Sequence, residues 1–134
     1  LPTDVAIFSA AVADFKVKEI NSEKIKKSEN LDLKLEKNID ILSNISNHNS
    51  LRQKITIGFA AESQNVEINS KRKLDQKNCD WIIANDISDK TIGFDSDDNE
   101  VSIFYKNKKS EKLLKKNKSL IASEIIDRVI SELN

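Results

Sequence analysis

One pattern that occurs three times constrains the fold of this chain more than any other feature. Each copy starts as a short apolar run, continues into small residues and ends at an acidic residue. The copies are VAIFSAAVAD (5–14), ITIGFAAE (55–62) and WIIAND (81–86). Such apolar runs are typical of strands buried on both faces of a parallel sheet. Because ligands bind beyond the carboxyl ends of such strands, the sequence predicts a binding region along one sheet edge.

The segments between these copies predict helices that alternate with strands. Strands are expected over 5–8, 54–60, 81–84 and 101–105, and helices from Asn38 or Asp40 to about 46 and over about 65–78. A last helix begins after Asn117 or Ser119, and its apolar residues recur at helical spacing: Leu120, Ile121, Ile125, Val129 and Leu133, broadened by Ile126 and Ile130. This alternation predicts a single α/β domain over residues 1–134, with parallel strands at the centre of its sheet.

Four polar segments fit that core less well. Residues 15–27 are charged, with isolated apolar residues, and predict an extended arm or flap. Residues 31–37 alternate, with Leu31, Leu33 and Leu35 on one side, which predicts a half-exposed strand. Residues 106–117 are basic and predict a hairpin arm or loop, while residues 85–99 predict a loop with a turn at DSDDN.

Composition excludes several classes of function. The 134 residues carry 22 basic and 22 acidic side chains, so no net charge favours nucleic acid or an anionic membrane. No apolar run approaches the roughly 20 residues of a membrane span. The single cysteine, Cys79, excludes an intrachain disulfide and suits a reducing cytoplasm. With only Gly58 and Gly93, these residues contain no glycine-rich dinucleotide or Walker A loop.

The start of the chain is abrupt. There is no methionine, and the opening LPTDVAIFS leads directly into a strand. We therefore expect the N-terminal part of the domain to be missing from these residues and to lie upstream in a longer protein.

Six motifs in a fixed order together resemble bacterial phosphopantothenate–cysteine ligase, the C-terminal half of the bifunctional coenzyme A biosynthesis protein in many bacteria. The resemblance extends from about Val5 to the final helix. The motifs are AAVADF (10–15), KIKK (24–27), NIDIL (38–42), GFAAE (58–62), AND (84–86) and GF (93–94) with Ser96, Asp97 and Asn99.

The resemblance implies a Rossmann-like fold with an extended β arm, and a cytoplasmic homodimer. It also implies a two-step ligation. CTP, with Mg²⁺, activates the carboxylate of 4'-phosphopantothenate as an acyl-cytidylate, which L-cysteine then converts to phosphopantothenoylcysteine. FMN is expected only if a decarboxylase domain is fused upstream, and the sequence does not identify the magnesium ligands.

The resemblance also implies the site residues. Lys24 is the expected catalytic lysine and contacts CTP. The other expected CTP-binding residues are Ser9, Ala10, Asp14, Asn38, Ile39, Asp40, Ile41, Phe59, Lys73 and Lys77. Ile39 departs from the family, which usually has proline at this position.

The chemistry of these residue types agrees with that assignment. An ionised Asp14 accepts hydrogen bonds from a ribose or a base amine, and a lysine such as Lys24 on an arm can neutralise phosphate charge. The amides that open the helix after Asn38 favour anions. Phe59 can stack on a base, for which Gly58 leaves room. Lys73 and Lys77 are four residues apart and share a helix face.

Each residue also has a structural interpretation. Asp14 can be a turn acid, Phe59 a core residue, and the lysines part of solvated charged faces. Cys79 and His48 have no partner pattern for a nucleophile or zinc site. A catalytically silent nucleotide-binding module therefore remains an alternative, as does a nicotinamide-dependent reductase domain whose glycine-rich loop lies upstream.

Overall fold

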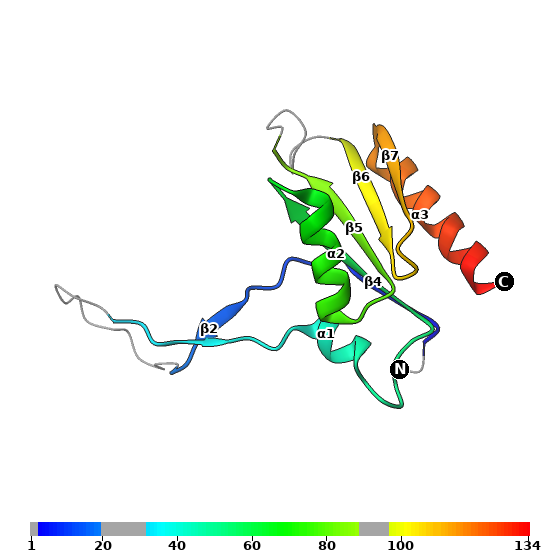
Figure 1. Ribbon diagram of the computed structural model, residues 1–134. Helices are drawn as coiled ribbons and strands as arrows, with labels where there is room; N and C mark the ends of the chain where they lie inside the picture. Colours follow the sequence, from blue (N-terminus) through cyan, green and yellow to red (C-terminus); the bar gives the residue numbers. More distant parts are fainter. Residues whose placement is uncertain (1–2, 20–31, 89–96) are drawn as a thin grey trace.

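A computed structural model describes residues 3–19, 32–88 and 97–134. Within those ranges one five-stranded sheet forms the body of the molecule, in the order β1–β4–β5–β6–β7 (Figure 1). Strands β1, β4 and β5 are parallel, whereas β6 and β7 are each antiparallel to the preceding strand. The strand bounds are β1 Val5–Phe8, β4 Ile55–Glu62, β5 Trp81–Asp86, β6 Asp98–Tyr105 and β7 Ser110–Asn117. The predicted α/β sheet with parallel central strands is confirmed.

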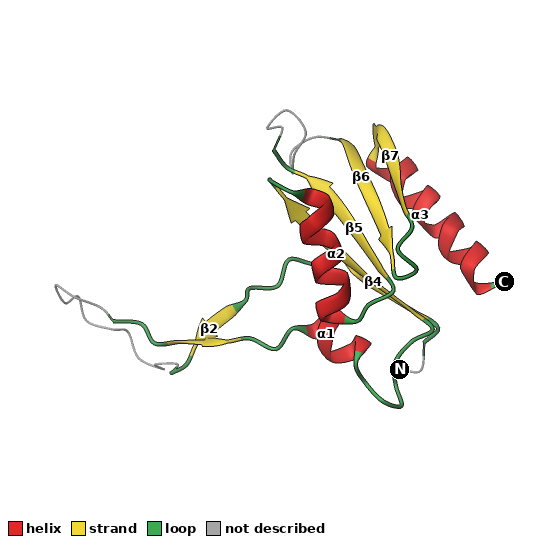
Figure 2. Ribbon diagram, in the orientation of Figure 1, coloured by secondary structure: helices red, strands yellow, loops and turns green. Residues whose placement is uncertain are grey.

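Helices cover both faces of this sheet (Figure 2). Helices α1 (Ile41–Ser46) and α2 (Val66–Lys77) pack on one face, and α3 (Lys118–Leu133) packs on the other. Side chains alternate between the faces along each strand. In β4, for example, Ile57 joins the cluster under α3, whereas Ala60 joins the cluster under α1 and α2.

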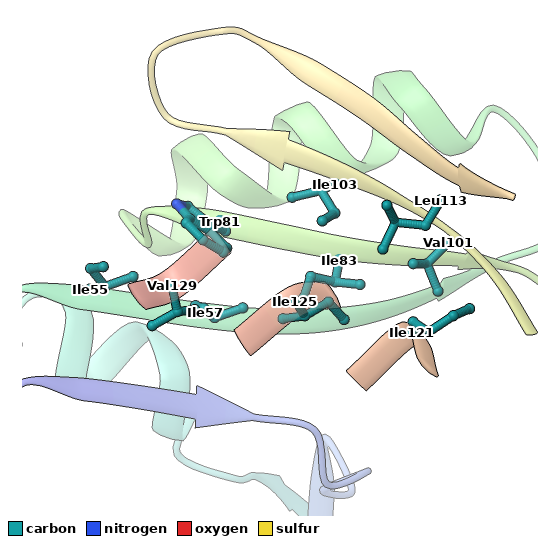
Figure 3. Close-up of a cluster of buried hydrophobic side chains, with 10 residues drawn as sticks. All are labelled: Ile55, Ile57, Trp81, Ile83, Val101, Ile103, Leu113, Ile121, Ile125 and Val129. Carbon is teal, nitrogen blue, oxygen red and sulfur yellow. The ribbon is translucent and has the colours of Figure 1, made fainter. Parts of the chain in front are cut away.

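The larger apolar cluster lies between the sheet and α3 (Figure 3). Strand residues form its base, and one stripe of α3 closes it. Its buried members are Ile55, Ile57, Trp81, Ile83, Val101, Ile103, Leu113, Ile121, Ile125 and Val129. Of the predicted α3 stripe, Leu120, Ile126, Ile130 and Leu133 remain exposed. The buried part of the stripe is thus narrower than the sequence predicts, because α3 touches the sheet along one line only.

Polar residues begin and end the helices. The Asp40 carboxylate accepts a hydrogen bond from the Ser43 amide at the start of α1, and the Asn117 side chain accepts one from Ser119 at the start of α3. These two caps decide between the alternatives that the sequence left open. Asn65 and Asn78 bound α2 with φ of 49° and 54°, a left-handed conformation that asparagine tolerates.

The predicted arm is partly confirmed. Strands β2 (Phe15–Val17) and β3 (Leu35–Lys37) form an antiparallel ribbon that projects away from the sheet (Figure 1). The predicted strand over 31–37 is shorter than expected and exposed, with Leu33 and Leu35 more than half accessible to solvent. Residues 20–31, which include Lys24, lie outside the described residues.

One prediction about strands is partly confirmed and one is wrong. The predicted hairpin arm or loop over 106–117 is a hairpin, in which residues 110–117 form β7 and pair with β6, with a register shift between Asn99 and Val101; it belongs to the main sheet and does not project as an arm. Strand β1 is not buried on both faces, because β4 is its sole neighbour among the described strands and Ile7 is 40% exposed. The predicted loop over 85–99 is also shorter, since its ends extend β5 and begin β6.

A polar network fixes the amino ends of β4 and β5. The Arg52 guanidinium donates to both carboxylate oxygens of Asp80 at 2.9 and 3.0 Å and to the Ser46 carbonyl at 2.8 Å. The same carboxylate accepts from the Thr56 amide at 2.7 Å and from its hydroxyl at 3.0 Å. One arginine thus ties the end of α1 to two parallel strands.

Candidate nucleotide site

The base of the arm joins two of the predicted site residues. The Asn38 amide donates to the carbonyl of Asp14 at 2.8 Å, and the Asn38 side chain donates to the carbonyl of Ala13 at 2.8 Å. Both hydrogen bonds involve main-chain acceptors, so the Asp14 carboxylate is not used in them, and it is exposed. The segment after β1 and the segment before α1 therefore lie side by side, with an acid on the surface.

Asp40 connects that segment to α2. One carboxylate oxygen accepts from the Ser43 amide at 3.0 Å, and the other lies 3.1 Å from the Lys77 ammonium. Partial burial acts to raise the pKa of Asp40, but the Ser43 hydrogen bond and Lys77 outweigh it, and the net pKa is lowered. Asp40 is therefore ionised at neutral pH. Its carboxylate accepts a hydrogen bond from the Ser43 amide, one of the amides at the start of α1 that the sequence predicts to favour an anion.

Lys73 lies one turn before Lys77 and also contacts a carboxylate. Its ammonium is 2.6 Å from Oε1 of Glu62, the last residue of β4. The other oxygen of Glu62 accepts from the Asn69 side chain at 3.2 Å. Because side chains on a helix lean toward its N-terminus, Lys73 reaches back to the carboxyl end of β4. That is the edge where ligands bind to sheets of this kind.

The remaining predicted residues on this side of the molecule lie on its surface. Ser9 and Ala10 follow β1 and are exposed, as are Ile39 and Ile41 around the start of α1. Ile39 lies before the helix and is 73% exposed, so it is not part of the buried face of α1. These four residues thus offer backbone and apolar surface to a ligand.

Phe59 lies apart from the lysines. It shares the α3 face of β4 with Ile57 and is 40% exposed, whereas Lys73 and Lys77 lie on the α2 side. The expectation that Gly58 leaves room for a base beside Phe59 is wrong. Leu42 of α1 fills the space at Gly58, where an added Cβ would lie 2.3 Å from the leucine Cδ2.

Two features of this region were not assigned a role from the sequence. Glu62 is the acidic residue that ends the second apolar run, and this position could have identified it as part of the site. The Arg52–Asp80 network could not have been identified from the sequence, because both residues lie in polar segments without a recognisable motif. Two surface grooves in the described part of the chain lie over β6 and β7 and at the amino ends of the strands, and neither contains a predicted site residue.

The arrangement suits anion binding rather than nucleophilic catalysis. Two ammonium groups lie on one side of α2, each against a carboxylate. Burial raises the pKa of Cys79 to about 11, so this thiol is protonated at neutral pH. Nowhere in residues 3–19, 32–88 and 97–134 do three His, Cys, Asp or Glu side chains gather as a metal site. No helix in these ranges has the length and apolar character of a membrane span.

Comparison with known proteins places the chain in a family. Residues 1–133 match the family described as the DNA/pantothenate metabolism flavoprotein C-terminal domain. The chain is 42% identical over 127 residues to the coenzyme A biosynthesis bifunctional protein CoaBC of Haemophilus influenzae, covering 94% of this chain and 31% of the relative. It is 46% identical over 127 residues to the protein of the same name from Borreliella burgdorferi, covering 92% and 31%.

Solved structures agree with that placement. The crystal structure of the C-terminal domain of a coenzyme A biosynthesis bifunctional protein CoaBC superposes with a TM-score of 0.72 at 32% identity, covering 97% of this chain and 57% of that one. A DNA/pantothenate metabolism flavoprotein from Streptococcus pneumoniae shares the fold, with a TM-score of 0.69 at 23% identity. The chain thus spans about a third of the length of the curated relatives.

Proposed function

The chain belongs to the DNA/pantothenate metabolism flavoprotein C-terminal domain family, and on that premise we propose that it forms the CTP-binding part of a phosphopantothenate–cysteine ligase. In the proposed reaction, a carboxylate oxygen of 4'-phosphopantothenate attacks the α-phosphorus of CTP and pyrophosphate leaves. The amine of L-cysteine then attacks the acyl carbon, loses a proton and displaces CMP. We assign the reaction to coenzyme A biosynthesis in the cytoplasm.

The observation that carries this proposal is the convergence of distant motifs on one side of the molecule. The AAVADF and NIDIL segments are hydrogen-bonded to each other through Asn38, and the second contacts Lys77 through Asp40. Lys73, on the same side of α2, lies at the carboxyl end of β4. A polyanion beside these lysines would meet two cations, with Asp14 free to accept hydrogen bonds from the nucleoside.

These positions support the following roles. Lys73 and Lys77 bind the triphosphate, and Ser9, Ala10 and the turn 38–41 border it. The role of Lys24, which lies outside the described residues, rests on the family resemblance: it neutralises charge in the transition state. A nucleotide that contacts both Phe59 and Lys73 must pass over the carboxyl end of β4, because the two side chains lie on opposite faces. Magnesium usually takes one or two carboxylates together with phosphate oxygens, so it would be held largely by the nucleotide. No residue of this chain is assigned to FMN.

We further propose that the arm makes a homodimer contact. Phe15, Val17 and Leu35 lie on one side of the β2–β3 ribbon and are at least 40% exposed, whereas the Lys16–Glu36 ion pair lies on the other side. A two-stranded ribbon is marginally stable alone, and an exposed apolar side indicates a partner surface. Sedimentation of the wild type against Phe15→Ser tests this, and equal masses at equal concentration would contradict it.

Calorimetric titration in magnesium buffer tests the nucleotide site. We expect saturable binding of CTP but not of ATP, weakened about tenfold or more by Lys73→Ala, Lys24→Ala or Asp14→Asn. Lys71→Ala is the matched control, because Lys71 is an exposed lysine of the same helix paired with Glu67. Equal losses in Lys71→Ala and Lys73→Ala would mean that net charge alone is measured, and the site would be wrong.

The silent-module alternative requires a second measurement. Pyrophosphate release from CTP is followed with 4'-phosphopantothenate and L-cysteine, on this chain and on the longest natural polypeptide that contains it. The ligase predicts release that depends on 4'-phosphopantothenate and is lost in Lys24→Ala. CTP binding without release in either polypeptide would favour the silent module.

A further inference from the structure

The two lysines proposed to bind the triphosphate are held by carboxylates that differ in environment. Glu62, the partner of Lys73, has a side chain only 11% exposed, and its second oxygen is held by Asn69. Asp40, the partner of Lys77, has a side chain 41% exposed. The two pairs thus combine similar chemistry with very different access to water.

This difference decides which pair can open. If Lys73 left Glu62, Oε1 would remain a buried carboxylate oxygen without any hydrogen-bond donor among the described residues, which is strongly unfavourable. If Lys77 left Asp40, the carboxylate would gain water and would keep its hydrogen bond from the Ser43 amide. The Asp40–Lys77 pair can therefore separate without damage to α1, and the Glu62–Lys73 pair cannot separate as easily.

We propose that Asp40 is an exchangeable partner of Lys77 that sets the affinity for nucleoside triphosphates relative to monophosphates. In the free protein the Asp40 carboxylate occupies the ammonium of Lys77, and the terminal phosphates of an incoming triphosphate displace it. A monophosphate does not reach Lys77 and leaves the pair intact. Glu62, in contrast, keeps Lys73 at the strand end in both states. This inference rests on the proposed function, because it takes Lys77 as a phosphate-binding residue.

The substitution Asp40→Asn removes the ion pair with Lys77 but keeps the helix cap, so it tests the exchange of Lys77 alone. Asparagine caps helices as well as aspartate does, so α1 keeps its first hydrogen bond. The substitution removes the charge that competes for Lys77. We expect CTP to bind about two- to fivefold more tightly, the range set by a partly exposed ion pair. We expect the Kd of CMP to stay the same, which raises the CTP-to-CMP selectivity by the same factor.

Calorimetric titrations of CTP and CMP in magnesium buffer, on the whole chain, measure both constants. Glu67→Gln is the control, because it removes the same charge from a carboxylate–lysine pair of α2 that faces solvent. It should leave both constants unchanged. In the Lys77→Ala background, Asp40→Asn should have no effect on CTP, because the residue on which it acts is gone.

Each result distinguishes the two proposals. Unchanged or weaker CTP binding in Asp40→Asn, with an unchanged Tm, overturns the exchange while the nucleotide site stands. Equal tightening of CMP and CTP also overturns it, because bulk charge then explains the effect. If neither the wild type nor Asp40→Asn binds CTP, the nucleotide site is wrong and the exchange falls with it.

Discussion

On the α3 face of the sheet, Ile121, Ile125 and Val129 cover a continuous apolar layer, whereas on the opposite face α1 and α2 each bury one apolar residue and one serine. Those residues are Leu42 with Ser46 and Leu74 with Ser70. The α3 face therefore carries most of the apolar burial that stabilises the fold. The α1/α2 face buries few apolar side chains, and its charged side chains, including Lys73 and Lys77, remain near the surface. Because this face contributes less apolar burial to stability, it can present cations to a ligand.

The largest expected effect tests the stabilising role of the α3 face. Ile57 is fully buried in the larger cluster, and Ile57→Ala should lower the free energy of unfolding by about 2–5 kcal/mol through lost burial and a cavity. Urea denaturation followed by the fluorescence of Trp81, the single tryptophan, measures it. Ile57→Val should cost about 0.5–1.5 kcal/mol and keeps the protein folded for titration. A weaker CTP affinity in that folded variant would contradict the division between the faces.

A substitution at Gly58, the residue after Ile57, tests the packing between β4 and α1 on the α1/α2 face. A methyl group added at Gly58 would lie 2.3 Å from Cδ2 of Leu42 and 3.1 Å from Cδ1 of Ile82. We expect Gly58→Ala to cost about 1–3 kcal/mol through overpacking. We also expect weaker CTP binding, because a shift of Leu42 moves α1 and with it Asp40.

Removal of the clashing side chain gives the control for that variant. In the double variant Gly58→Ala/Leu42→Ala, the loss in free energy of unfolding should be smaller than the sum of the two single losses. The new methyl group then enters the cavity that Leu42→Ala leaves. Additive losses would mean that Leu42 does not transmit the change. Unchanged CTP binding in Gly58→Ala would mean that the placement of α1 does not matter to the site.

Some elements of the fold could be predicted from the sequence and others could not. The last helix followed from the spacing of its apolar residues, and its cap was limited to Asn117 or Ser119 by residue type, because both are local properties. Strand β7 did not, because SEKLLKKN has the charged composition of an edge strand and pairs only through its contact with β6. The exposure of Ile7 was also out of reach, because it depends on what lies beside β1 rather than on β1 itself.

The site shows the same limit. The family resemblance groups Asp14, Asn38, Asp40 and Lys77, and the structure connects the segments that carry them by hydrogen bonds and an ion pair. Alternation along β4 already separates Gly58 from Phe59, but the sequence does not show which face each helix covers. For that reason Phe59 was grouped with residues that lie across the sheet. The partners of the lysines, Asp40 and Glu62, are tertiary contacts that no spacing rule provides.

The smallest expected effect concerns a carboxylate that connects β7 to α3. Glu111 of β7 accepts two hydrogen bonds from Arg128 of α3, both at 2.8 Å, and one from Tyr105. The Arg128 hydrogen bonds lower the pKa of Glu111 below its usual range, against partial burial. A lowered carboxyl pKa adds stability that is present above the unfolded-state pKa and is lost as the pH falls through the folded-state pKa. The gain should be about 1 kcal/mol, because the pair is partly exposed.

Glu111→Gln should therefore lower the free energy of unfolding at pH 7 by about 1 kcal/mol, and the difference from the wild type should shrink as the pH falls below about 4.5. Urea denaturation from pH 3 to pH 7 measures the difference. Glu67→Gln on the solvent side of α2 should change stability by less than about 0.5 kcal/mol at pH 7. A loss in Glu67→Gln as large as in Glu111→Gln would show that ion pairs support both faces equally, and the contrast between the faces would then rest on apolar burial alone.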